Sequence, residues 1–322
     1  MSVFAGAEPT TVLHLDVAGR PLRVEAHGDA ASVAVTPALG HLATGRPAGG
    51  ALPFRVWTDD GDVHPLWEPD ARGPARLGDF GLAMSRPEPP MLEVFTPNEG
   101  LELWGTRAGL AAGDTIAHPA GTAMAAWLAT SGAEVLHVGA VSFDDRAALV
   151  VGTGGAGKST TVVASGLGGA EILGDDMCLV DRDATTGETR VHALYATVKL
   201  NDDSATRLGL DDWPVLGVTP KGKRVLAIGA PLRLRSSAPV RAIVALEPSD
   251  GAAIAAPRRL SRREALRVLV PTGLNAALGA VGLDDWFSLA LHLARTVPAF
   301  AVARHWDLPR VVGDLATVVP RA

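Results

Sequence analysis

The second half of the chain is organised around Ala148-Leu149-Val150-Val151-Gly152-Thr153-Gly154-Gly155-Ala156-Gly157-Lys158-Ser159. Residues 152–159 match the pattern G-x-x-x-x-G-K-[S/T] at every position. Residues 148–151 are apolar and predict a strand, and residues 157–165 predict a helix. A strand, a glycine-rich loop and a helix in this order form the setting in which the pattern binds phosphate groups.

The pattern predicts a task for each of its parts. Glycine lets the backbone curve so that N–H groups surround phosphate oxygens, and the N-terminus of the following helix favours an anion. Lys158 would reach the β- and γ-phosphates, and the Ser159 hydroxyl would coordinate Mg²⁺, so we expect ATP and Mg²⁺ as cofactors. The alternative is a strand-to-helix turn that binds no ligand. The expected ATP-binding residues are Gly152, Thr153, Gly154, Gly155, Ala156, Gly157, Lys158, Ser159 and Thr160.

Two carboxylates follow the loop, at the end of the strand-like run 170–174. A carboxylate at a strand end beside a phosphate loop is where nucleotide enzymes hold Mg²⁺, so we expect Ser159 and Asp175 as metal ligands. Adjacent residues of an extended chain point to opposite sides, so Asp175 and Asp176 can divide metal binding and proton removal between them. The alternative is a solvated turn. Other Asp pairs occur at 144–145, 202–203, 211–212 and 284–285.

His137 lies upstream of the loop, in the apolar run 135–143 that predicts a strand. By itself, a His in such a strand is more often a buried core residue than a functional one. Its position becomes informative only in combination with the loop and the Asp pair.

The composition opposes several classes of function. The chain has 322 residues, with 29 Lys and Arg against 35 Asp and Glu and a net charge of −6, which opposes non-specific nucleic-acid binding. No apolar run is long enough to span a bilayer, and residues 1–9 lack the features of a secretory signal. The single Cys178 cannot form an internal disulfide. We expect a cytoplasmic protein without nucleic-acid or membrane partners. Whether it forms a homo-oligomer is left open.

The two halves of the chain differ in pattern. Residues 1–115 predict a β-rich region of unassigned role, with a hairpin at 11–26 and a second turn at 59–61. Residues 69–90 are rich in Gly, Pro and Arg and predict a loop. From 116 to 322 the pattern changes to strands mixed with helices, which predicts a separate α/β domain.

These features together resemble the HPr kinase/phosphorylase family, whose kinase core is similar to that of phosphoenolpyruvate carboxykinase. In that family a His in an upstream strand precedes the phosphate loop, a helix and a strand that ends in Asp-Asp. Here His137 lies 21 residues before Lys158, and Asp175 and Asp176 lie 17 and 18 residues after it. The resemblance is close over residues 118–200. It implies an α/β fold with a phosphoenolpyruvate-carboxykinase-like P-loop kinase core after the β-rich N-terminal region.

The resemblance also implies catalytic roles for four residues. His137 would lie near the transferred phosphate, and Lys158 would bind that phosphate. The pair Asp175 and Asp176 would supply the base that takes the proton from an acceptor hydroxyl. Asp176 is favoured as the base, and Asp175 stays open.

The sequence departs from the family pattern in several places. Thr160 replaces the Glu that usually follows the loop Ser, which favours kinase activity without reverse phosphorolysis. The family's further Glu ligand for Mg²⁺ is missing, and Asn201, Asp202 and Asp203 are weak substitutes for it. The later Pro-Val and Gly-Arg pair is also absent, so HPr is not the expected substrate. The chain is more similar to divergent members associated with ribosomal peptide natural products, some of which phosphorylate Ser on a precursor peptide.

The sequence therefore predicts an ATP-dependent kinase that acts on a Ser or Thr hydroxyl of a peptide or protein, a ribosomal peptide precursor included. A small-molecule hydroxyl kinase with the same core is one alternative, and a non-catalytic nucleotide-binding switch is another. The chain lacks the Asn-Lys-x-Asp motif of GTPases and the Leu-Ser-Gly-Gly-Gln segment of transporter ATPases. Positive charge for a transition state could come from Lys199, Lys221, Lys223 or Arg224, although most such side chains are solvated.

Overall fold

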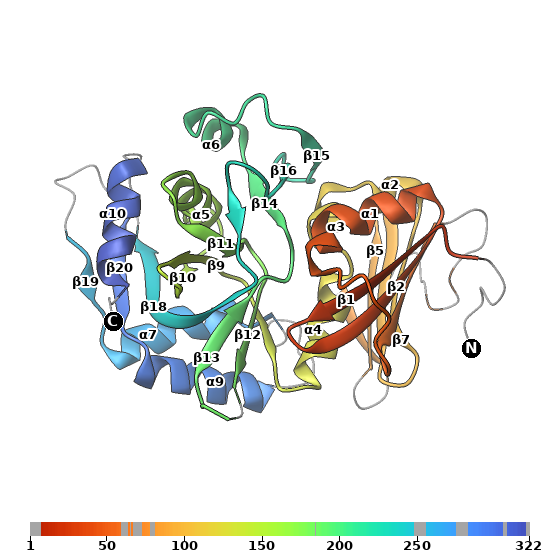
Figure 1. The fold of residues 1–322 in the computed structure, drawn as a ribbon, viewed down its shortest axis with the longest axis horizontal. Helices are drawn as coiled ribbons and strands as arrows, with labels where there is room; N and C mark the ends of the chain where they lie inside the picture. Colours follow the sequence, from red (N-terminus) through yellow and green to blue (C-terminus); the bar gives the residue numbers. More distant parts are fainter. Residues whose placement is uncertain are drawn as a thin grey trace. The chain divides into compact units, whose positions relative to one another are not determined.

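The computed structural model describes most of the chain, which falls into two compact units. The described residues are 8–58, 64, 66, 73–77, 81–183, 185–247, 256–274, 283–304 and 308–319. The first unit comprises Met1–Ser131 and Pro214–Ala227, and the second comprises Gly132–Trp213 and Ile228–Ala322. Each unit combines helices with a mixed sheet (Figure 1). The α/β class and the β-rich N-terminal region are therefore confirmed.

The first unit is built on a seven-stranded sheet. Its strands have the spatial order β1 (Thr11–Val17), β2 (Arg20–His27), β3 (Leu52–Thr58), β7 (Gly100–Gly105), β6 (Pro90–Thr96), β5 (Gly81–Pro87) and β4 (Gly73–Leu77). β1 and β2 form the predicted antiparallel hairpin, whereas β3 runs parallel to both β2 and β7. Helix α1 (Asp29–Leu39) makes the crossover from β2 to β3 and buries a stripe that includes Ala31, Val35 and Leu39, the spacing of an amphipathic helix.

Short helices and a strand pair complete the first unit. These elements are α2 (Arg107–Leu110), α3 (Gly113–Ala117), α4 (Gly121–Ala129), β15 (Val215–Val218) and β16 (Arg224–Ala227). The predicted boundary between residues 115 and 116 differs from this division, because α4 packs against β5, β6 and β7. In addition, the first N–H groups of α4, those of Thr122 and Ala123, donate hydrogen bonds to Glu93 in β6.

The second unit is built on a larger sheet, in which ten strands are described. Eight of them have the spatial order β17 (Arg233–Leu234), β11 (Glu171–Gly174), β9 (Gly139–Phe143), β10 (Arg146–Val151), β18 (Ser237–Glu247), β13 (Thr189–His192), β12 (Cys178–Arg182) and β8 (Glu134–Leu136). β20 (Ala299–Ala303) extends the sheet beside β18 and also pairs with β19 (Arg258–Arg259). β18 runs parallel to β10 and β20, whereas β9 is antiparallel to β10 and β11.

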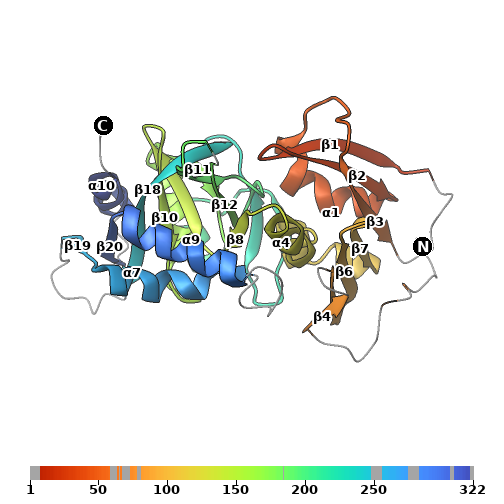
Figure 2. The ribbon, with the colours of Figure 1, turned by 90° about the horizontal axis from the view of Figure 1, so that it is seen from below.

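Helices cover both faces of this sheet (Figures 1 and 2). Below it in Figure 1 lie α7 (Arg262–Leu269) and α9 (Leu283–Thr296), and their Leu269 and Trp286 share a buried core with Leu149 of β10. Above it lies α5 (Lys158–Leu167), which contacts β9, β10 and β11 and packs beside α10 (Leu308–Val318). Strand β14 (Thr197–Leu200) and helix α6 (Asp202–Arg207) belong to the same unit.

One further expectation, the loop at 69–90, has a definite outcome. The stretch 69–90 is not a loop, because it contains β4 and β5, and β5 pairs antiparallel with both β4 and β6. Several of its Gly and Pro residues, such as Gly73, Gly81 and Pro87, lie at strand ends, where they do not interrupt pairing. Helix α7 begins with a capping box, in which the Ser261 side chain accepts the N–H of Glu264 and the Glu264 side chain accepts the N–H of Ser261. The turn expected at 59–61 lies outside the described residues.

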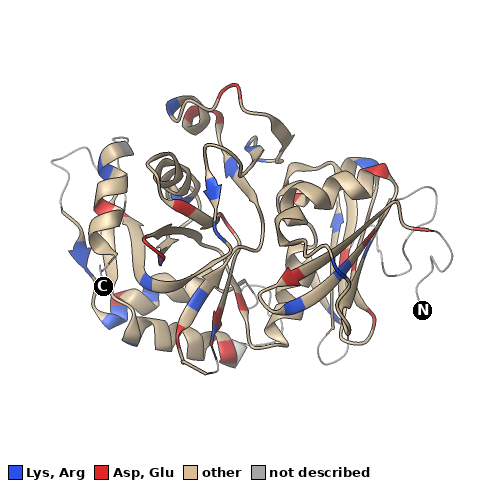
Figure 3. Cartoon of the chain, viewed as in Figure 1, with Lys and Arg blue, Asp and Glu red and all other residues tan. Residues whose placement is uncertain are grey.

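The surface charges follow the overall balance. Lys and Arg are interspersed with Asp and Glu along the elements of each unit (Figure 3). Within the described ranges, no helix is long and apolar enough to cross a membrane. One local group of charged side chains, Asp176 with His137 and Lys199, lies in the second unit.

Candidate functional site

The glycine-rich loop connects the end of β10, at Val151, to the start of α5, at Lys158. Its backbone uses conformations that glycine adopts without strain, with φ of +80° at Gly155 and +95° at Gly157. A Cβ atom at position 157 would also lie 3.0 Å from the Cδ atom of Arg304. The predicted order of strand, loop and helix is confirmed, with a glycine at the residue that caps the helix.

The side chain of Lys158 folds over the loop. Its Nζ atom donates a hydrogen bond to the carbonyl oxygen of Gly152 at 2.8 Å and lies 3.5 Å from that of Thr153. The residue is buried. The positive charge therefore lies at the curve of the loop, next to the N-terminus of α5. A cation and a helix N-terminus together favour an anion at this place.

The first turn of α5 presents two hydroxyl groups to different surroundings. The Ser159 hydroxyl interacts with the carboxylate of Asp175 and lowers the pKa of that group. The Oγ1 atom of Thr160 lies 2.9 Å from the Oγ atom of Ser204 on α6. Consecutive residues of a helix are rotated by about 100° around its axis, because a turn takes 3.6 residues. The loop region therefore has one side that faces Asp175 and another that faces α6.

The connection from β11 to β12 holds Asp176 in an unusual backbone conformation. Asp176 has φ of +70°, and the N–H of Met177 donates a hydrogen bond to the carbonyl oxygen of Asp175 at 2.8 Å. A hydrogen bond across one residue with positive φ is the rare and strained form of the γ-turn. The expectation of an extended backbone at this pair is therefore wrong. The two carboxylates nevertheless have different partners, as follows.

Asp175 is a buried carboxylate with incomplete hydrogen bonding. Its Oδ2 atom accepts a hydrogen bond from the N–H of Lys199, in β14, at 3.1 Å. Its Oδ1 atom is buried and has no hydrogen-bond partner among the described residues. Burial raises the pKa of Asp175 from 3.8 to about 6, and the nearby charge of Asp176 adds to this rise. The Lys199 N–H and the Ser159 hydroxyl oppose the rise because they stabilise the ionised form.

Asp176 is the centre of a charged cluster. The Nε2 atom of His137 lies 2.5 Å from its Oδ1 atom, and the Nζ atom of Lys199 lies 2.5 Å from its Oδ2 atom. The Lys199 side chain is 12% exposed, whereas that of His137 is 49% exposed, so the cluster opens to solvent on the His137 side. The structure thus brings His137 together with the Asp pair, and it adds Lys199. The catalytic roles of these residues stay predictions.

His137 lies between two strands. The predicted strand 135–143 is interrupted after β8 and resumes as β9. The interruption lets β8 pair with β12, while β9 pairs with β10 and β11. Within it, the N–H of His137 donates to the carbonyl oxygen of Thr272 at 2.7 Å, and the imidazole contacts Asp176. A single strand through His137 and a buried core position for its side chain are therefore both wrong.

Ser159 and Asp175 fit the chemistry of a magnesium site. In the described part of the chain, no group of three or more His, Cys, Asp or Glu side chains could hold a metal ion. Mg²⁺ does not need such a cage, because one or two carboxylates and the phosphates of a substrate commonly bind it. The buried Oδ1 atom of Asp175, without a hydrogen-bond partner within the described ranges, and the nearby Ser159 hydroxyl are oxygen atoms of the kind that could bind it.

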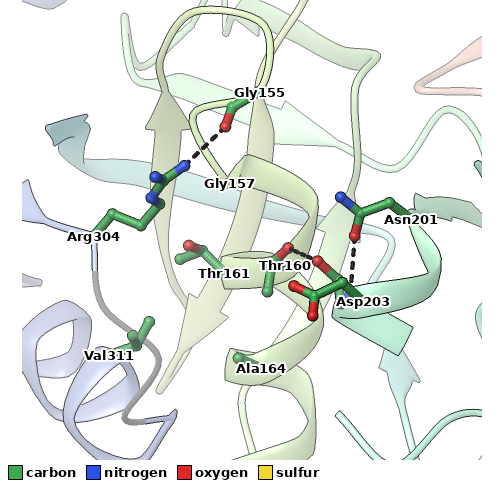
Figure 4. A pocket seen from close by; sticks show the side chains of 10 residues that line it. Gly155, Gly157, Thr160, Thr161, Ala164, Asn201, Asp203, Arg304 and Val311 are labelled. Atoms are coloured by element: carbon green, nitrogen blue, oxygen red, sulfur yellow. Dashed lines mark hydrogen bonds between the residues drawn. The ribbon is translucent and has the colours of Figure 1, made fainter. Parts of the chain in front are cut away.

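A shallow cavity adjoins the loop on its Thr160 side (Figure 4). Its lining consists of Gly155, Gly157, Thr160, Thr161, Ala164, Asn201, Asp203, Ser204, Arg304 and Val311. Arg304 closes one flank, where its Nη1 atom donates to the carbonyl oxygen of Gly155 at 3.0 Å. Asn201 lies on the other flank and caps α6 by accepting the N–H of Ser204 at 2.9 Å.

Sequence reasoning named Lys199 only as one of four possible sources of positive charge, and it did not name Arg304. The feature that could have singled out Lys199 is its position inside a strand, β14, whose other residues are buried. Arg304 follows β20, far along the chain from the loop, and only the tertiary structure places it there. The remaining cations considered, Lys221, Lys223 and Arg224, belong to the first unit.

Comparisons with known proteins give limited information. No family model matches the chain, and no curated protein matches it. Among solved structures, the chain is similar to the HPr(Ser) kinase/phosphatase from Coxiella burnetii, with 12% sequence identity and a TM-score of 0.31. The similarity covers 57% of this chain and 95% of that one. It is a weak, family-level resemblance, so an activity has to be inferred from the residues of the site.

Proposed function

We propose that the chain is an ATP-dependent kinase with a phosphoenolpyruvate-carboxykinase-like P-loop core, and that it phosphorylates a Ser or Thr hydroxyl of a peptide or protein. One observation carries this proposal: a carboxylate, Asp176, contacts both His137 and Lys199 directly beside the glycine-rich loop. A site that only binds a nucleotide needs the loop. It does not need a carboxylate that contacts a lysine and a histidine next to it.

The loop would bind the phosphates of ATP. Its N–H groups and the N-terminus of α5 favour an anion, and Lys158 holds its charge at the curve of the loop. Ser159 and Asp175 would hold Mg²⁺, which supplies charge neutralisation for the β- and γ-phosphates when it is bound. The phosphate chain would then run across the first turn of α5, with its γ end toward Asp175 and Asp176.

Asp176 would accept the proton of the acceptor hydroxyl. As the hydroxyl oxygen forms its bond to the γ-phosphorus, the bond from that phosphorus to the β–γ bridging oxygen breaks and ADP leaves. The proton of the hydroxyl passes to the Asp176 carboxylate. The exposed side of the cluster, at His137, is where an acceptor would enter.

Lys199 and His137 would supply positive charge to the reaction. Both side chains lie within ion-pair distance of the Asp176 carboxylate and hold it in place. The transferring phosphoryl group carries negative charge, and these two cationic or hydrogen-bonding groups lie where that charge would develop. The backbone N–H of Lys199 also holds Asp175, so one residue of β14 positions both carboxylates.

The acceptor is assigned by its chemistry only. A base and an open entrance suit a hydroxyl on a flexible segment, such as a Ser or Thr of a peptide, a ribosomal peptide precursor included. Thr160 stands where the family that the sequence resembles has a Glu, and its hydroxyl contacts Ser204. The proposal is therefore a kinase without the reverse phosphorolysis.

The proposal is tested with a library of Ser- and Thr-containing peptides, incubated with the chain, ATP and Mg²⁺ and analysed by mass spectrometry. We expect a phosphoryl mass increase on a subset of peptides. Asp176→Asn should abolish the transfer and preserve ADP binding, Lys158→Ala should weaken ADP binding, and the exposed Asp211→Asn should change neither. Transfer only to small polyols would favour a small-molecule kinase. Full transfer by both Asp175→Asn and Asp176→Asn would show that the mechanism is wrong.

A further inference from the structure

The cavity on the Thr160 side of the loop has no role in the proposed transfer step. It begins at the loop itself, where Gly155 and Gly157 form part of its wall. Its floor is the outward face of α5 at Thr161 and Ala164, and Val311 of α10 adds apolar surface (Figure 4). An apolar floor with a few polar groups at its edge is typical of small-molecule sites.

The direction of the phosphate chain relates this cavity to the nucleotide. In the proposed nucleotide site, the γ-phosphate lies at Ser159 and Asp175, which interact with each other. Thr160 is the next residue of the same helix, and its side chain faces the cavity and Ser204. A triphosphate held by the loop with its γ end at Asp175 therefore has its other end, the α-phosphate and the nucleoside, on the cavity side.

Two charged side chains stand on opposite flanks of the cavity. On one flank, Arg304 lies over the loop, with its guanidinium bonded to Gly155 and its Cδ atom close to Gly157. On the other, the Asp203 carboxylate is held by the Nε atom of Arg207, at 3.0 and 3.1 Å from its two oxygens. A carboxylate has about four acceptor positions, so Asp203 keeps capacity for further hydrogen bonds while Arg207 fixes its orientation.

We propose that this cavity binds the nucleoside of a ribonucleotide, with Asp203 accepting hydrogen bonds from the ribose hydroxyls and the Arg304 guanidinium lying against the base. This inference rests on the proposed nucleotide site at the loop. A carboxylate that accepts hydrogen bonds from ribose hydroxyls is a recurrent device of nucleotide sites, and a planar guanidinium stacks on planar rings. Arg304 thus joins the phosphate loop to the base, because it contacts the loop as well.

The size of the cavity agrees with a partly exposed nucleoside. Its volume is about 120 Å³. Sites that enclose a whole drug-sized ligand have volumes of about 300–1,000 Å³. The base and ribose would therefore lie on the α5 surface with one side in solvent, and their contribution to affinity is moderate.

The test compares three ligands by calorimetry in the presence of Mg²⁺: ADP, 2′,3′-dideoxy-ADP and tripolyphosphate. We expect the wild-type chain to bind ADP about tenfold more tightly than dideoxy-ADP, which corresponds to about 1.4 kcal/mol. Asp203→Asn should remove this preference, and Arg304→Ala should weaken ADP binding about tenfold with a smaller effect on tripolyphosphate. The matched controls are Asp211→Asn and Arg310→Ala, whose side chains do not line the cavity.

The outcomes separate this inference from the proposed function. If the wild-type chain binds neither ADP nor tripolyphosphate, the nucleotide site itself is refuted, and the inference with it. If both bind but Asp203→Asn retains the preference for ADP over dideoxy-ADP, only the nucleoside assignment is overturned. It is also overturned if Arg304→Ala weakens tripolyphosphate as much as ADP, because Arg304 would then act on the loop alone.

Discussion

Glu93 in the first unit and Asp175 in the second are both buried carboxylates, yet their hydrogen bonding differs. Glu93 is 1% exposed, and its two oxygens accept hydrogen bonds from the N–H of Thr122 at 2.7 Å and from Arg86 at 3.2 Å. Asp175 is 2% exposed, and its Oδ1 atom has no hydrogen-bond partner in the part of the chain that the structure describes.

The hydrogen bonds of Glu93 stabilise the fold, whereas Asp175 has an oxygen that can still accept a ligand. Leaving a buried polar group unpaired costs about 1–3 kcal/mol, so such groups are rare in folded proteins. Glu93 avoids this cost, because it stabilises the N-terminus of α4 and pairs with Arg86. Asp175 bears it at a strained turn beside the glycine-rich loop. Stability does not explain such an arrangement, which is the kind expected of the proposed cation site.

The largest expected effect is on catalysis by Asp175. Asp175→Asn should lower kcat for transfer to an acceptor peptide by about 10³-fold, because a neutral amide cannot replace a carboxylate that holds Mg²⁺ against the phosphates. Glu93→Gln should leave kcat per folded molecule within about twofold, since Glu93 contributes to packing and capping only. Steady-state kinetics on both variants checks the contrast. Equal losses in kcat would mean that the two carboxylates do not differ in the way described.

The next effect is on the stability of the first unit. Glu93→Gln should cost about 2–3 kcal/mol, because it replaces charge-assisted hydrogen bonds and puts an amide donor next to the donors of α4 and Arg86. Hydrogen exchange at the Thr122 amide measures the effect locally, and we expect it to accelerate by roughly the factor that this free energy implies. Unchanged protection of the first turn of α4 would show that Glu93 is not its cap.

A smaller effect, a gain in stability, is expected in the second unit for Asp175→Asn. The pKa of Asp175 is raised from 3.8 to about 6, so the native state favours its protonated form. Below pH 3.8 Asp175 is protonated in both the folded and the unfolded state and costs no stability. As the pH rises toward 6, the unfolded state ionises more readily than the folded state, so the free energy of unfolding falls, and above pH 6 the loss is complete. Asp175→Asn removes the ionisation and should stabilise the protein at pH 7 by on the order of 2 kcal/mol.

The measurement is a series of thermal unfolding curves from pH 3.5 to 7.5, without nucleotide or Mg²⁺. The difference in Tm between Asp175→Asn and the wild-type chain should be near zero at the acidic end and grow through the window up to about pH 6. A matched Asp211→Asn variant should show no such trend. A Tm difference that shrinks as the pH rises would contradict the proposed environment of Asp175.

The sequence predicted the part of the site that lies close together along the chain. The loop, Ser159 and the Asp pair were predictable because their spacing is fixed by one strand, one helix and the next strand. Lys199 could not be singled out from three other cations, and Arg304 was missed, because their positions depend on where β14 and β20 pack. The interruption of the strand at His137 was also not predictable, since it reflects a choice between pairing partners of β8 and β9 that local pattern does not encode.

The same limit applies to the division of the chain. The β-rich character of the first unit follows from local propensity, and its hairpin at 11–26 was predicted from turn residues. Residues 116–131 are apolar and helical in either unit, so the sequence does not reveal which sheet α4 covers. The hydrogen bond from Thr122 to Glu93 reveals it, and that contact joins residues far apart in the chain. Likewise, the return of 214–227 to the first unit has no signal in the local pattern.

The smallest expected effect concerns the ion pair of Glu93. The Arg86 side chain is 40% exposed, and its Nη2 atom lies 3.2 Å from the Oε1 atom of Glu93. Solvent screens an ion pair with one exposed partner, so Arg86→Gln should cost less than about 1 kcal/mol. Urea unfolding followed by tryptophan fluorescence measures this difference, with Arg23→Gln as a control in the same sheet. A loss as large as that of Glu93→Gln would assign the stabilisation to the ion pair.

A double-mutant cycle of Arg86→Gln and Glu93→Gln makes the contrast quantitative. If the α4 cap dominates, the coupling energy between the two side chains should be about 0.5–1 kcal/mol, well below the cost of Glu93→Gln alone. The remainder then belongs to the N–H groups of α4, whose N-cap residue, Ala120, makes no side-chain capping bond to them. A coupling energy above about 2 kcal/mol would mean that Glu93 is retained for its charge partner. The two carboxylates would then differ in their charge partners and not in the number of hydrogen bonds that they accept. The partner of Glu93 would be Arg86, and that of Asp175 would be a bound cation.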